Sequence, residues 1–327
     1  MKALVTGGGG FLGGAIVRLL CGRGDDVRSL SRGDYPALKE LGVEQFHGDI
    51  AVAPAVDDAV ADCDVVFHVA AKAGVWGVYD EYHRANVVGT ENVIAACRKH
   101  GVSKLVYTSS PSVVFDGTDM EGVDESVSYP DHYHADYPKT KAMAEKAVLA
   151  ANDGKLATVS LRPHLIWGPG DNHLVPRIIE RGRAGKLRRI GKRANKVDAV
   201  YIDNAAEAHI LAADKLAPNS PVAGKAYFIT NDEPVVVWDF IDQILECAGL
   251  PPVKRTISPE LAYFAGSALE TVHGVLGIKS EPRMTRFVAR ELATAHWFDI
   301  SAARRDFGYT PKVTMEAGLR RLRASLK

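Results

Sequence analysis

The sequence predicts an α/β protein in which a doubly wound parallel sheet carries a smaller, mostly C-terminal lobe. Over the first half of the 327 residues, short runs rich in β-branched residues alternate with helix-length segments. This alternation is typical of parallel strands joined by crossover helices. A glycine-rich stretch, residues 6–13, joins the first run to the first helical segment, and after Ile166 the alternation ends. The end of the pattern indicates a change of architecture.

Six segments of the first half have the composition of strands. Residues 104–108, Lys-Leu-Val-Tyr-Thr, are apolar almost throughout, which is typical of a strand buried on both faces of a parallel sheet. The expected strands are residues 3–6, 27–30, 43–47, 65–69, 104–109 and 157–161. Between them, the segments expected to form the covering helices are residues 11–21, 82–99 and 136–151.

The second half begins with a basic, loop-rich stretch that runs from Gly168 to Lys196. We divide the chain into a core, residues 1–166, and a lobe, mainly residues 167–327, with residues 203–230 returning to the core as a helix (204–216) and a strand (226–230). Several helices follow from Trp238 onward. Residues 259–277 hold enough Leu, Tyr, Phe and Val to form a lid over an apolar ligand, and a helix packed on the core explains the same pattern.

The composition excludes several classes of protein. Forty basic residues balance forty acidic ones, so net charge gives no attraction to nucleic acid or to an anionic membrane. Cys21, Cys63, Cys97 and Cys247 lie far apart without a C-x-x-C pair, which favours reduced, buried thiols. No leader precedes the first strand, and no apolar stretch reaches the roughly 20 residues of a membrane helix. We therefore expect a cytoplasmic protein with no spanning segment and no nucleic acid partner.

A cluster of polar residues before Tyr137 invites a metal-binding interpretation. Asp131, His132 and His134 lie within four positions of one another, but no second ligand pair follows at helical or hairpin spacing. We therefore expect no metal, and these histidines are interpreted as polar loop residues near the mouth of a pocket.

The glycine-rich stretch has the pattern of a phosphate-binding loop. Gly7, Gly10 and Gly13 form G-x-x-G-x-x-G directly after a strand and at the start of a helix. Missing side chains let the backbone turn tightly and approach a pyrophosphate, while the helix N-terminus offers free amides and positive potential. The alternative is a tight turn without a ligand. The context of strand, glycines and helix favours a dinucleotide site of the Rossmann type.

The end of the second strand bears on the identity of the dinucleotide. An acidic residue that binds the adenosine ribose is usual about 20 residues beyond the loop, but this place reads Leu30-Ser31-Arg32. A hydroxyl followed by a guanidinium suits a 2′-phosphate, because arginine offers forked donors to phosphate oxygens. This pattern favours NADP(H). The alternative is that Arg32 is a solvated loop charge and Asp34 binds the ribose.

Tyr137 and Lys141 are four residues apart, so on a helix they lie on one face. A free phenol titrates near pH 10, and bringing its pKa to about 7 requires roughly 4 kcal/mol. One unit charge at about 4 Å supplies about that much at an effective dielectric of about 20. The spacing alone is common on helix surfaces. Together with the glycine loop, it indicates a redox site in which Lys141 is expected to lower the pKa of Tyr137.

These motifs identify a resemblance to the extended short-chain dehydrogenases, and within them to the 3β-hydroxysteroid dehydrogenase-like group. The resemblance covers the whole chain. It rests on residues 6–13, 48–50 (Gly-Asp-Ile), 68–71 (His-Val-Ala-Ala), 86–90 (Asn-Val-Val-Gly-Thr), 107–110 (Tyr-Thr-Ser-Ser), 137–141, 161–163 (Leu-Arg-Pro), 201–204 (Tyr-Ile-Asp-Asn) and 304–311.

The resemblance implies a role for each matching residue. Tyr137 becomes the catalytic acid, Lys141 its activator and a ligand of the nicotinamide ribose, and Ser110 a hydrogen-bond donor to the substrate oxygen. Ser109 and Ser112 offer hydroxyls nearby, and a serine at a strand end also commonly caps a turn. The implied cofactor-binding residues are Gly7, Gly10, Phe11, Leu12, Gly13, Ser31, Arg32, Asp49, Ile50, Ala70, Ala71, Tyr137, Lys141, Pro163 and His164.

Asn86 has two interpretations. Within the resemblance it orders the helix that carries Tyr137, whereas by composition it suits the N-cap of a helix beginning at Val87. Trp76 and Trp167 are likewise candidates for lining the substrate pocket or for ordinary core and rim positions.

Three further segments resemble bacterial 2-alkyl-3-oxoalkanoate reductases of long-chain olefin biosynthesis: residues 71–77, 165–171 and 195–198. This resemblance implies NADPH-dependent reduction of the 3-keto group of a large, forked, apolar substrate that carries one carboxylate. It also implies contact with other enzymes of the olefin pathway, and the wider family implies a homodimer. The basic run from Arg177 to Lys196 offers candidates for binding the carboxylate, most of them expected to be solvated.

Three other functions remain open. A 3β-hydroxysteroid or sterol dehydrogenase would use the same residues in the oxidative direction. A nucleotide-sugar epimerase or reductase could bind a diphosphate with residues 183–193, although the apolar segment 259–277 argues against it. A redox sensor or scaffold would bind a dinucleotide without turnover, but such proteins often lose the tyrosine or the lysine, and both are present.

Overall fold

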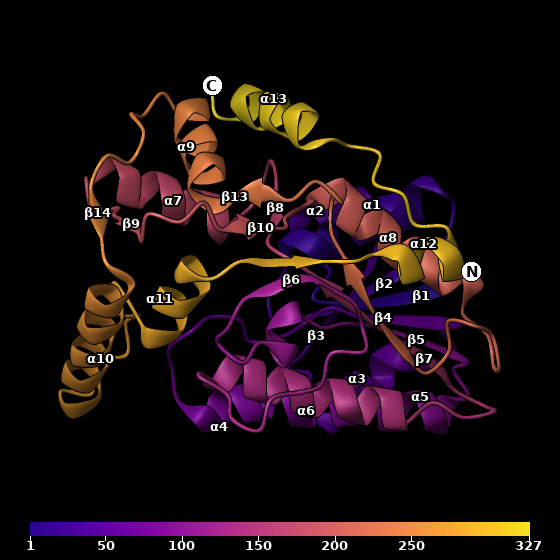
Figure 1. Ribbon diagram of the computed structural model, residues 1–327. Coiled ribbons are helices and arrows are strands. Elements are labelled where there is room, and N and C mark those ends of the chain that lie inside the picture. Colours follow the sequence, from indigo (N-terminus) through magenta and orange to yellow (C-terminus); the bar gives the residue numbers. More distant parts are fainter.

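The computed structural model describes all residues from Met1 to Lys327. Its centre is a seven-stranded parallel sheet in the order β12-β7-β5-β4-β1-β2-β3 (Figure 1). The strands are β1 (Lys2–Thr6), β2 (Asp26–Ser31), β3 (Glu44–His47), β4 (Val65–His68), β5 (Lys104–Thr108), β7 (Ala157–Pro163) and β12 (Lys225–Ile229). All seven strands expected from the sequence are confirmed, each to within two residues at either end.

The chain changes direction of travel across the sheet between β1 and β4. It runs from β1 outward to β3, then returns to β4 on the other side of β1 and continues toward β12. In parallel sheets, ligands bind at such a switch point, beyond the carboxyl ends of the strands. Here those ends are Thr6 and His68, which are paired in register.

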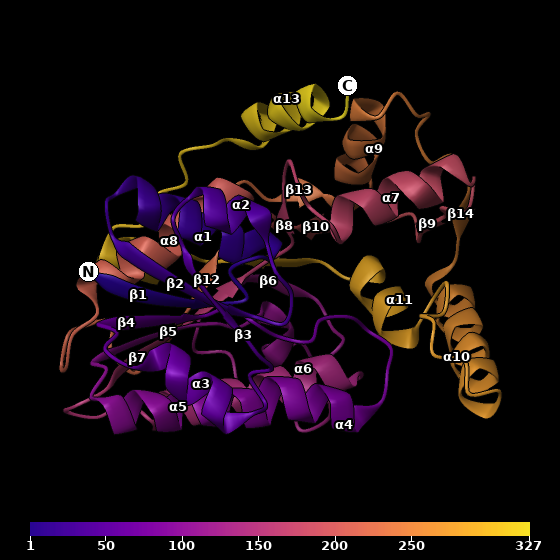
Figure 2. The same cartoon turned by 180° about the vertical axis from the view of Figure 1, so that it is seen from behind.

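Helices cover both faces of the sheet (Figures 1 and 2). On one face lie α1 (Phe11–Gly22) and α8 (Ile202–Lys215); on the other lie α3 (Ala53–Val60), α5 (Gly89–His100) and α6 (Asp136–Ala150). Successive residues of a strand point to opposite faces, so Ala3 and Val5 pack in one core and Leu4 in the other. The sheet is buried on both faces, as the apolar strand sequences predict. A short α2 (Pro36–Glu40) precedes β3.

The helix expected over residues 82–99 is not a single α-helix. It consists of α4 (Tyr79–Tyr82), a π-helical turn η1 (His83–Val88) and α5. A π-turn accommodates one extra residue per turn and commonly occurs at functional sites. The backbone here bulges around Asn86, whose side chain bonds with residues outside the helix.

The second lobe is built around a four-stranded sheet in the order β13-β10-β15-β6. Its strands are β13 (Val235–Val236), β10 (Lys196–Val197), β15 (His296–Phe298) and β6 (Met120–Val123), the last contributed by the first half of the chain. Two two-stranded pairs, β8 (Ile166–Trp167) with β11 (Val200–Tyr201) and β9 (Arg189–Ile190) with β14 (Thr256–Ile257), adjoin it. The lobe's helices are α7 (Leu174–Arg183), α9 (Val237–Cys247), α10 (Pro259–Val275), α11 (Arg286–Ala293) and α13 (Met315–Ser325).

Two smaller elements complete the fold. A 3-10 turn, η2 (Pro111–Val114), follows β5, and α12 (Ser301–Phe307) lies against α8 and β12. All four cysteines are free thiols; Cys21 is half-buried and the other three are buried. None of the helices combines the length and apolar composition that crossing a bilayer requires.

Candidate active site

The glycine loop is closed so tightly that side chains cannot be added to it. Gly7 has φ of +73°, and a Cβ atom there would lie 3.1 Å from the backbone of Ala70. A Cβ on Gly13 would lie 2.1 Å from the carbonyl oxygen of Gly7. Gly10 begins α1 without a side-chain cap, so the first amides of the helix remain available to an anion. The cradle fits a dinucleotide pyrophosphate.

A chain of hydrogen bonds fixes the end of β4 beside this loop. The Thr6 hydroxyl oxygen accepts from the amides of Val69 and Ala70, both at 3.1 Å. The two nitrogens of the His68 ring contact the hydroxyls of Thr6 (2.8 Å) and Thr90 (3.0 Å). Burial lowers the pKa of His68 to about 3, so the ring is neutral. The sequence predicts Ala70 and Ala71 at the cofactor, but it does not indicate that the Thr6 hydroxyl fixes the backbone at Val69 and Ala70.

The residues expected at the adenosine end lie together at the ends of β2 and β3. Arg32 is exposed and has no ion-pair partner, and Asp34 is exposed beside it. The ring of Tyr35 covers Gly9 so closely that a Cβ on Gly9 would lie 2.3 Å from it. Gln45 holds Tyr35 in place by bonds to its backbone nitrogen (3.0 Å) and oxygen (3.2 Å). Tyr35 was not among the predicted residues, although an aromatic side chain three residues after Arg32 is a signal that could have pointed to it.

Asp49 and Ile50 follow β3. One carboxylate oxygen of Asp49 accepts from the amide of Ala51 at 2.9 Å, and the other pairs with Arg84 at 3.0 Å. Ile50 is buried against Gly89, where a Cβ atom would lie 2.7 Å from the isoleucine side chain. These contacts fix both residues at the same edge of the sheet as the glycine loop.

Tyr137 and Lys141 lie one turn apart near the start of α6. Tyr137 is partly buried, and Lys141 is 2% exposed. The Lys141 ammonium donates to the carbonyl of Thr108 at 2.6 Å and lies 4.2 Å from the centre of the Tyr107 ring. Burial lowers the pKa of Lys141 to about 7, while the charge of Glu145 acts in the opposite direction.

The expected direction of the Tyr137 pKa shift is wrong for this structure. Burial raises the pKa of Tyr137 to about 12; the Ser110 hydroxyl acts to lower it, and the charge of Glu291 adds to the rise. In this site a phenolate would lose more hydration free energy than the surrounding hydrogen-bond donors and charges supply. Tyr137 therefore carries its proton at neutral pH, which is the form that a proton donor needs.

Ser110 combines the two roles considered for it. As the N-cap of η2 it accepts from the amide of Ser112 at 3.2 Å and from the Ser112 hydroxyl at 2.9 Å. Because the Ser112 hydroxyl donates, the proton of the Ser110 hydroxyl is free to point toward another acceptor. The Ser110 hydroxyl also acts to lower the pKa of Tyr137. Ser109 is buried without a hydrogen-bond partner for its hydroxyl.

Asn86 orders the active-site helix, as expected, and the N-cap alternative is wrong because Asn86 lies inside η1. Its side-chain oxygen accepts from the amide of Lys72 at 2.8 Å, and its nitrogen donates to the Lys72 carbonyl (3.1 Å) and the Thr140 hydroxyl (3.0 Å). Thr140 in turn donates to the carbonyl of Asp136 at 2.8 Å. Asn86 thus joins the loop after β4 to the turn of α6 that carries Tyr137.

A buried ion pair secures the middle of the same helix. Arg162 on β7 donates to the carboxylate of Glu145 on α6 at 2.6 Å, and both side chains are at most 3% exposed. Ser160 and Tyr129 donate to the same carboxylate, both at 2.7 Å. The Arg162 guanidinium holds the pKa of Glu145 below its usual range despite burial. This pair lies one turn after Lys141 and fixes α6 on the sheet.

Pro163 and His164 end β7 at the junction of the core with the lobe. A carbonyl oxygen only accepts hydrogen bonds, so the His296 nitrogen that contacts the Glu291 carbonyl (2.9 Å) is the donor. The other nitrogen of the His296 ring therefore accepts from His164 at 2.7 Å. Burial keeps the pKa of His164 well below its usual value. The second nitrogen of His164 is therefore left as an acceptor. The sequence could not predict this pairing, which joins residues 132 positions apart.

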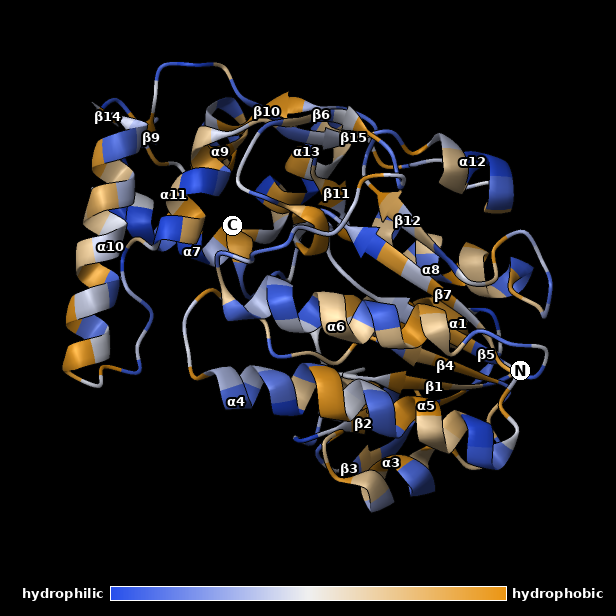
Figure 3. Cartoon of the chain, turned by 60° about the horizontal axis from the view of Figure 1, so that its bottom comes forward, coloured by the Kyte–Doolittle hydropathy of each residue, from blue (hydrophilic) through white to orange (hydrophobic).

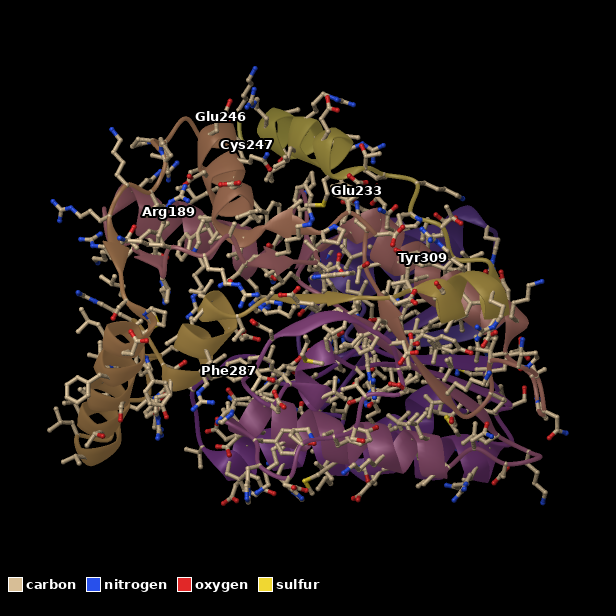
Figure 4. All side chains as sticks on the ribbon, in the orientation of Figure 1. Arg189, Glu233, Glu246, Cys247, Phe287 and Tyr309 are labelled. Carbon is tan, nitrogen blue, oxygen red and sulfur yellow. The ribbon has the colours of Figure 1, made fainter.

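Helix α11 faces the catalytic residues from the lobe. Phe287, labelled in Figure 4, packs edge-on against Phe115 with ring centres 6.0 Å apart. Burial raises the pKa of Glu291 to about 8, so this carboxyl is largely protonated at neutral pH, and it raises the pKa of Tyr137 once it is ionised. Trp167 is fully buried against Tyr201 and Phe240, so it is a core residue and does not line a pocket.

The basic run of the lobe is partly neutralised by ion pairs. Arg177 pairs with Glu281, Arg189 with Asp242, and Arg193 with Asp119 and Glu121. The members without an ion pair are Arg181, Arg183, Lys186, Arg188, Lys192 and Lys196.

Of the loop histidines before Tyr137, His134 forms a hydrogen bond with the carbonyl of Asp116 at 2.9 Å.

Comparisons with known proteins agree with this geometry. The model of the 3-beta hydroxysteroid dehydrogenase/isomerase family matches residues 4–260. A 2-alkyl-3-oxoalkanoate reductase of Stenotrophomonas maltophilia is 54% identical over 99% of both chains, and one of Shewanella oneidensis is 51% identical over 99% of this chain and 86% of its own. The structure of Thermus thermophilus UDP-glucose 4-epimerase in complex with NAD is 25% identical, with a TM-score of 0.75 over 100% of this chain and 99% of that one. The chain is a nicotinamide-dependent oxidoreductase that belongs to the 3-beta hydroxysteroid dehydrogenase/isomerase family.

Proposed function

We propose that this protein uses NADPH to reduce the 3-keto group of a long-chain 2-alkyl-3-oxoalkanoate to the 2-alkyl-3-hydroxyalkanoate, as a step of olefin biosynthesis. The observation that carries the proposal is the identity of 54% and 51% with two reductases of that name over nearly the whole chain. Retention of Tyr137, Lys141 and Ser110 in one buried site supports turnover rather than binding alone.

In this proposal each site residue has one task. Ser110 donates a hydrogen bond to the ketone oxygen, and Tyr137, protonated at neutral pH, transfers its proton to that oxygen as the alcohol forms. Bound NADPH supplies the hydride that the keto carbon receives. Lys141 binds the nicotinamide ribose, for which its ammonium must turn from the Thr108 carbonyl or share its protons with it. Tyr137 regains its proton from solvent.

The cofactor assignment rests on the arrangement around the glycine loop. The amides of Phe11, Leu12 and Gly13 at the start of α1 are assigned to the pyrophosphate. The remaining assignments are Ser31 and Arg32 to the 2′-phosphate, Asp49 and Ile50 to the adenine, and Ala70, Ala71, Pro163 and His164 to the nicotinamide side. Arg32 supports NADPH over NADH because its guanidinium is exposed without a carboxylate partner.

The cellular setting is part of the same proposal. Free thiols support a cytoplasmic location. Other enzymes of the olefin pathway and a second copy of this chain are the partners that the resemblance suggests.

The second candidate is a 3β-hydroxysteroid or sterol dehydrogenase, which the description of the matching family favours. It would use the same tyrosine and lysine in the oxidative direction, with the tyrosine accepting a proton.

A substrate panel separates the two candidates. A synthetic 2-alkyl-3-oxoalkanoate and a 3β-hydroxysteroid are each supplied with NADPH, NADH, NADP⁺ and NAD⁺, and nicotinamide absorbance is followed. The proposal predicts oxidation of NADPH with the keto acid. Activity restricted to the steroid with NAD⁺ would overturn it.

A further inference from the structure

Helix α10 presents an apolar stripe to solvent. Leu261, Phe264, Val272 and Val275 are 55%, 72%, 48% and 81% exposed, and Leu276 beyond the helix end is 67% exposed. Together with the exposed Ala268, they follow at intervals of three and four residues, so they lie along one face. Figure 3 shows hydrophobic residues along the length of α10, at one end of the molecule. Exposed large apolar residues that gather in one stripe indicate an interaction surface.

The opposite face of α10 is already occupied. Ala262 and Gly266 are the buried residues of the helix, and a Cβ atom on Gly266 would lie 2.7 Å from the backbone of Thr285. Glu270 of the helix pairs with Arg286 at 2.5 Å. The helix is thus held on α11 by small residues and an ion pair, and its apolar stripe is the face that folding leaves uncovered.

Positive charge is concentrated around this helix, although the whole chain is neutral. Residues 174–196 and 250–290 hold fifteen of the forty basic residues and only four of the forty acidic ones. Four of the fifteen are in ion pairs, namely Arg177, Arg189, Arg193 and Arg286, and the others have no ion-pair partner. Lys254 and Arg255, exposed and without ion pairs, lead through β14 into α10. Gly191, next to Lys192, lies against Pro259 at the start of the helix. Basic residues therefore flank the N-terminal end of the apolar stripe.

We infer that α10 docks this protein on the surface of an anionic lipid bilayer, with its apolar stripe in the interface and the flanking lysines and arginines at the headgroups. A helix with an apolar face beside basic residues binds anionic membranes in two ways: its apolar face is buried in the interface, and its basic residues are attracted to the anionic headgroups. A second copy of the chain fits less well, because two-fold pairing through this stripe would bring the two sets of basic residues together.

The docking surface adjoins the active-site loop. Trp76, on the loop after β4, donates to the carbonyl of Ile278 at 3.2 Å and packs edge-on against His273 with ring centres 5.8 Å apart. The same loop is held at Lys72 by Asn86. If the proposed acyl substrate is correct, a bilayer at α10 would bring it close to the loop that follows β4. The docking itself does not depend on that substrate.

Sedimentation with lipid vesicles tests the inference on the full chain. Vesicles of phosphatidylglycerol and phosphatidylcholine in equal parts should bind the protein, vesicles of phosphatidylcholine alone should bind it less, and salt should weaken binding by screening. The double variant Leu261→Ser with Phe264→Ser should bind about tenfold or more weakly, since it removes exposed apolar area. The matched control is Leu19→Ser with Leu41→Ser, which replaces two exposed leucines elsewhere.

Charge is tested separately. Lys254→Gln with Arg255→Gln should weaken binding to anionic vesicles several-fold, whereas Lys155→Gln with Lys215→Gln, two exposed lysines elsewhere, should not. No binding to anionic vesicles would overturn the inference, as would a dimer that the α10 variant dissociates. Because sedimentation reads binding and not turnover, a wrong substrate assignment leaves this result unchanged.

Discussion

Burial raises the pKa of Tyr137 to about 12, so the phenol is protonated at neutral pH and can act as a proton donor. The sequence predicts the tyrosine and the lysine at the right spacing, but it predicts the wrong direction for the phenol pKa. The reason is that desolvation depends on residues from other elements, such as Glu291 on α11, that no local pattern reveals. The tight conformation of the glycine loop could be predicted because it depends on which positions of a local turn lack a side chain.

Tyr137→Phe removes the proton donor and leaves the ring in place. We expect kcat to fall about 10²- to 10⁴-fold, while the Kd for NADPH, measured by fluorescence titration, changes little. The matched control is Tyr79→Phe, at a partly buried position in α4, just before η1. Near-normal turnover of Tyr137→Phe would remove Tyr137 from the proton transfer.

Lys141 makes the stability of the protein depend on pH. Its pKa is about 7 in the folded chain, against an ordinary value of about 10.5. Between these values the unfolded chain binds the extra proton, so the free energy of unfolding rises with pH across this window. Urea unfolding at pH 7 and pH 9.5 should show a rise of a few kcal/mol that Lys141→Met abolishes and Lys139→Met, at an exposed neighbour, retains. An equal rise in all three proteins would contradict this account.

At the level of elements, α6 is held near its start and at its middle by contacts that cross the fold. Asn86 fixes its first turn through Thr140, and Arg162 fixes Glu145 beyond Lys141. The helix itself could be predicted from its sequence. The π-turn at η1 could not, because it accommodates bonds between Asn86 and residues 14 and 54 positions away.

Asn86→Ala tests whether this residue positions the active site. Loss of three hydrogen bonds should lower the free energy of unfolding by about 1–3 kcal/mol, measured by urea titration. We also expect kcat to fall with little change in the KM for NADPH, because Asn86 acts on α6 and not on the cofactor. A loss of stability at unchanged kcat would show a purely structural role.

The buried pair of Glu145 and Arg162 should matter far more than ion pairs at the surface. Glu145→Ala leaves Arg162 charged and unpaired in the core, and we expect it to cost about 3–5 kcal/mol of stability. Glu316→Ala, which breaks the exposed pair with Arg320, should cost less than about 1 kcal/mol. Chemical denaturation of the two variants in parallel provides the measurement, and equal losses would contradict the assigned burial effect.

At the level of the whole molecule, the sheet and the lobe meet at the switch point of the strands. The parallel, doubly wound architecture could be predicted from the alternation of the sequence, and so could the position of the glycine loop, whereas the order of the strands came from the structure. The lobe was less predictable, because its sheet takes β6 from the first half of the chain and pairs it with β15, some 175 residues later. His164 and His296 meet across the same junction. Such contacts join segments whose local patterns carry no signal of each other.

The exposed stripe of α10 is a feature of the surface of the whole molecule. The apolar composition of residues 259–277 was visible in the sequence, where it suggested either a lid or a helix packed on the core. In the structure Ala262, Gly266 and Tyr263 are on the packed side of the helix, whereas Leu261, Phe264, Val272 and Val275 are exposed. The tail beyond α12 is bound more firmly: Asn204 and Asn231 both donate to the carbonyl of Val313 at 2.8 Å. Tyr309 and Glu233, labelled in Figure 4, contact the same region.

The central claim is that this site transfers a hydride to the 3-keto carbon of a 2-alkyl-3-oxoalkanoate. The most direct measurement incubates the protein with that keto acid and NADPH carrying deuterium at C4 of the nicotinamide, one stereoisomer at a time, and analyses the product by mass spectrometry. We predict a 2-alkyl-3-hydroxyalkanoate with one deuterium on C3 from one stereoisomer of the cofactor and none from the other. A keto acid that remains unreduced, or a product without deuterium from either stereoisomer, would contradict the claim.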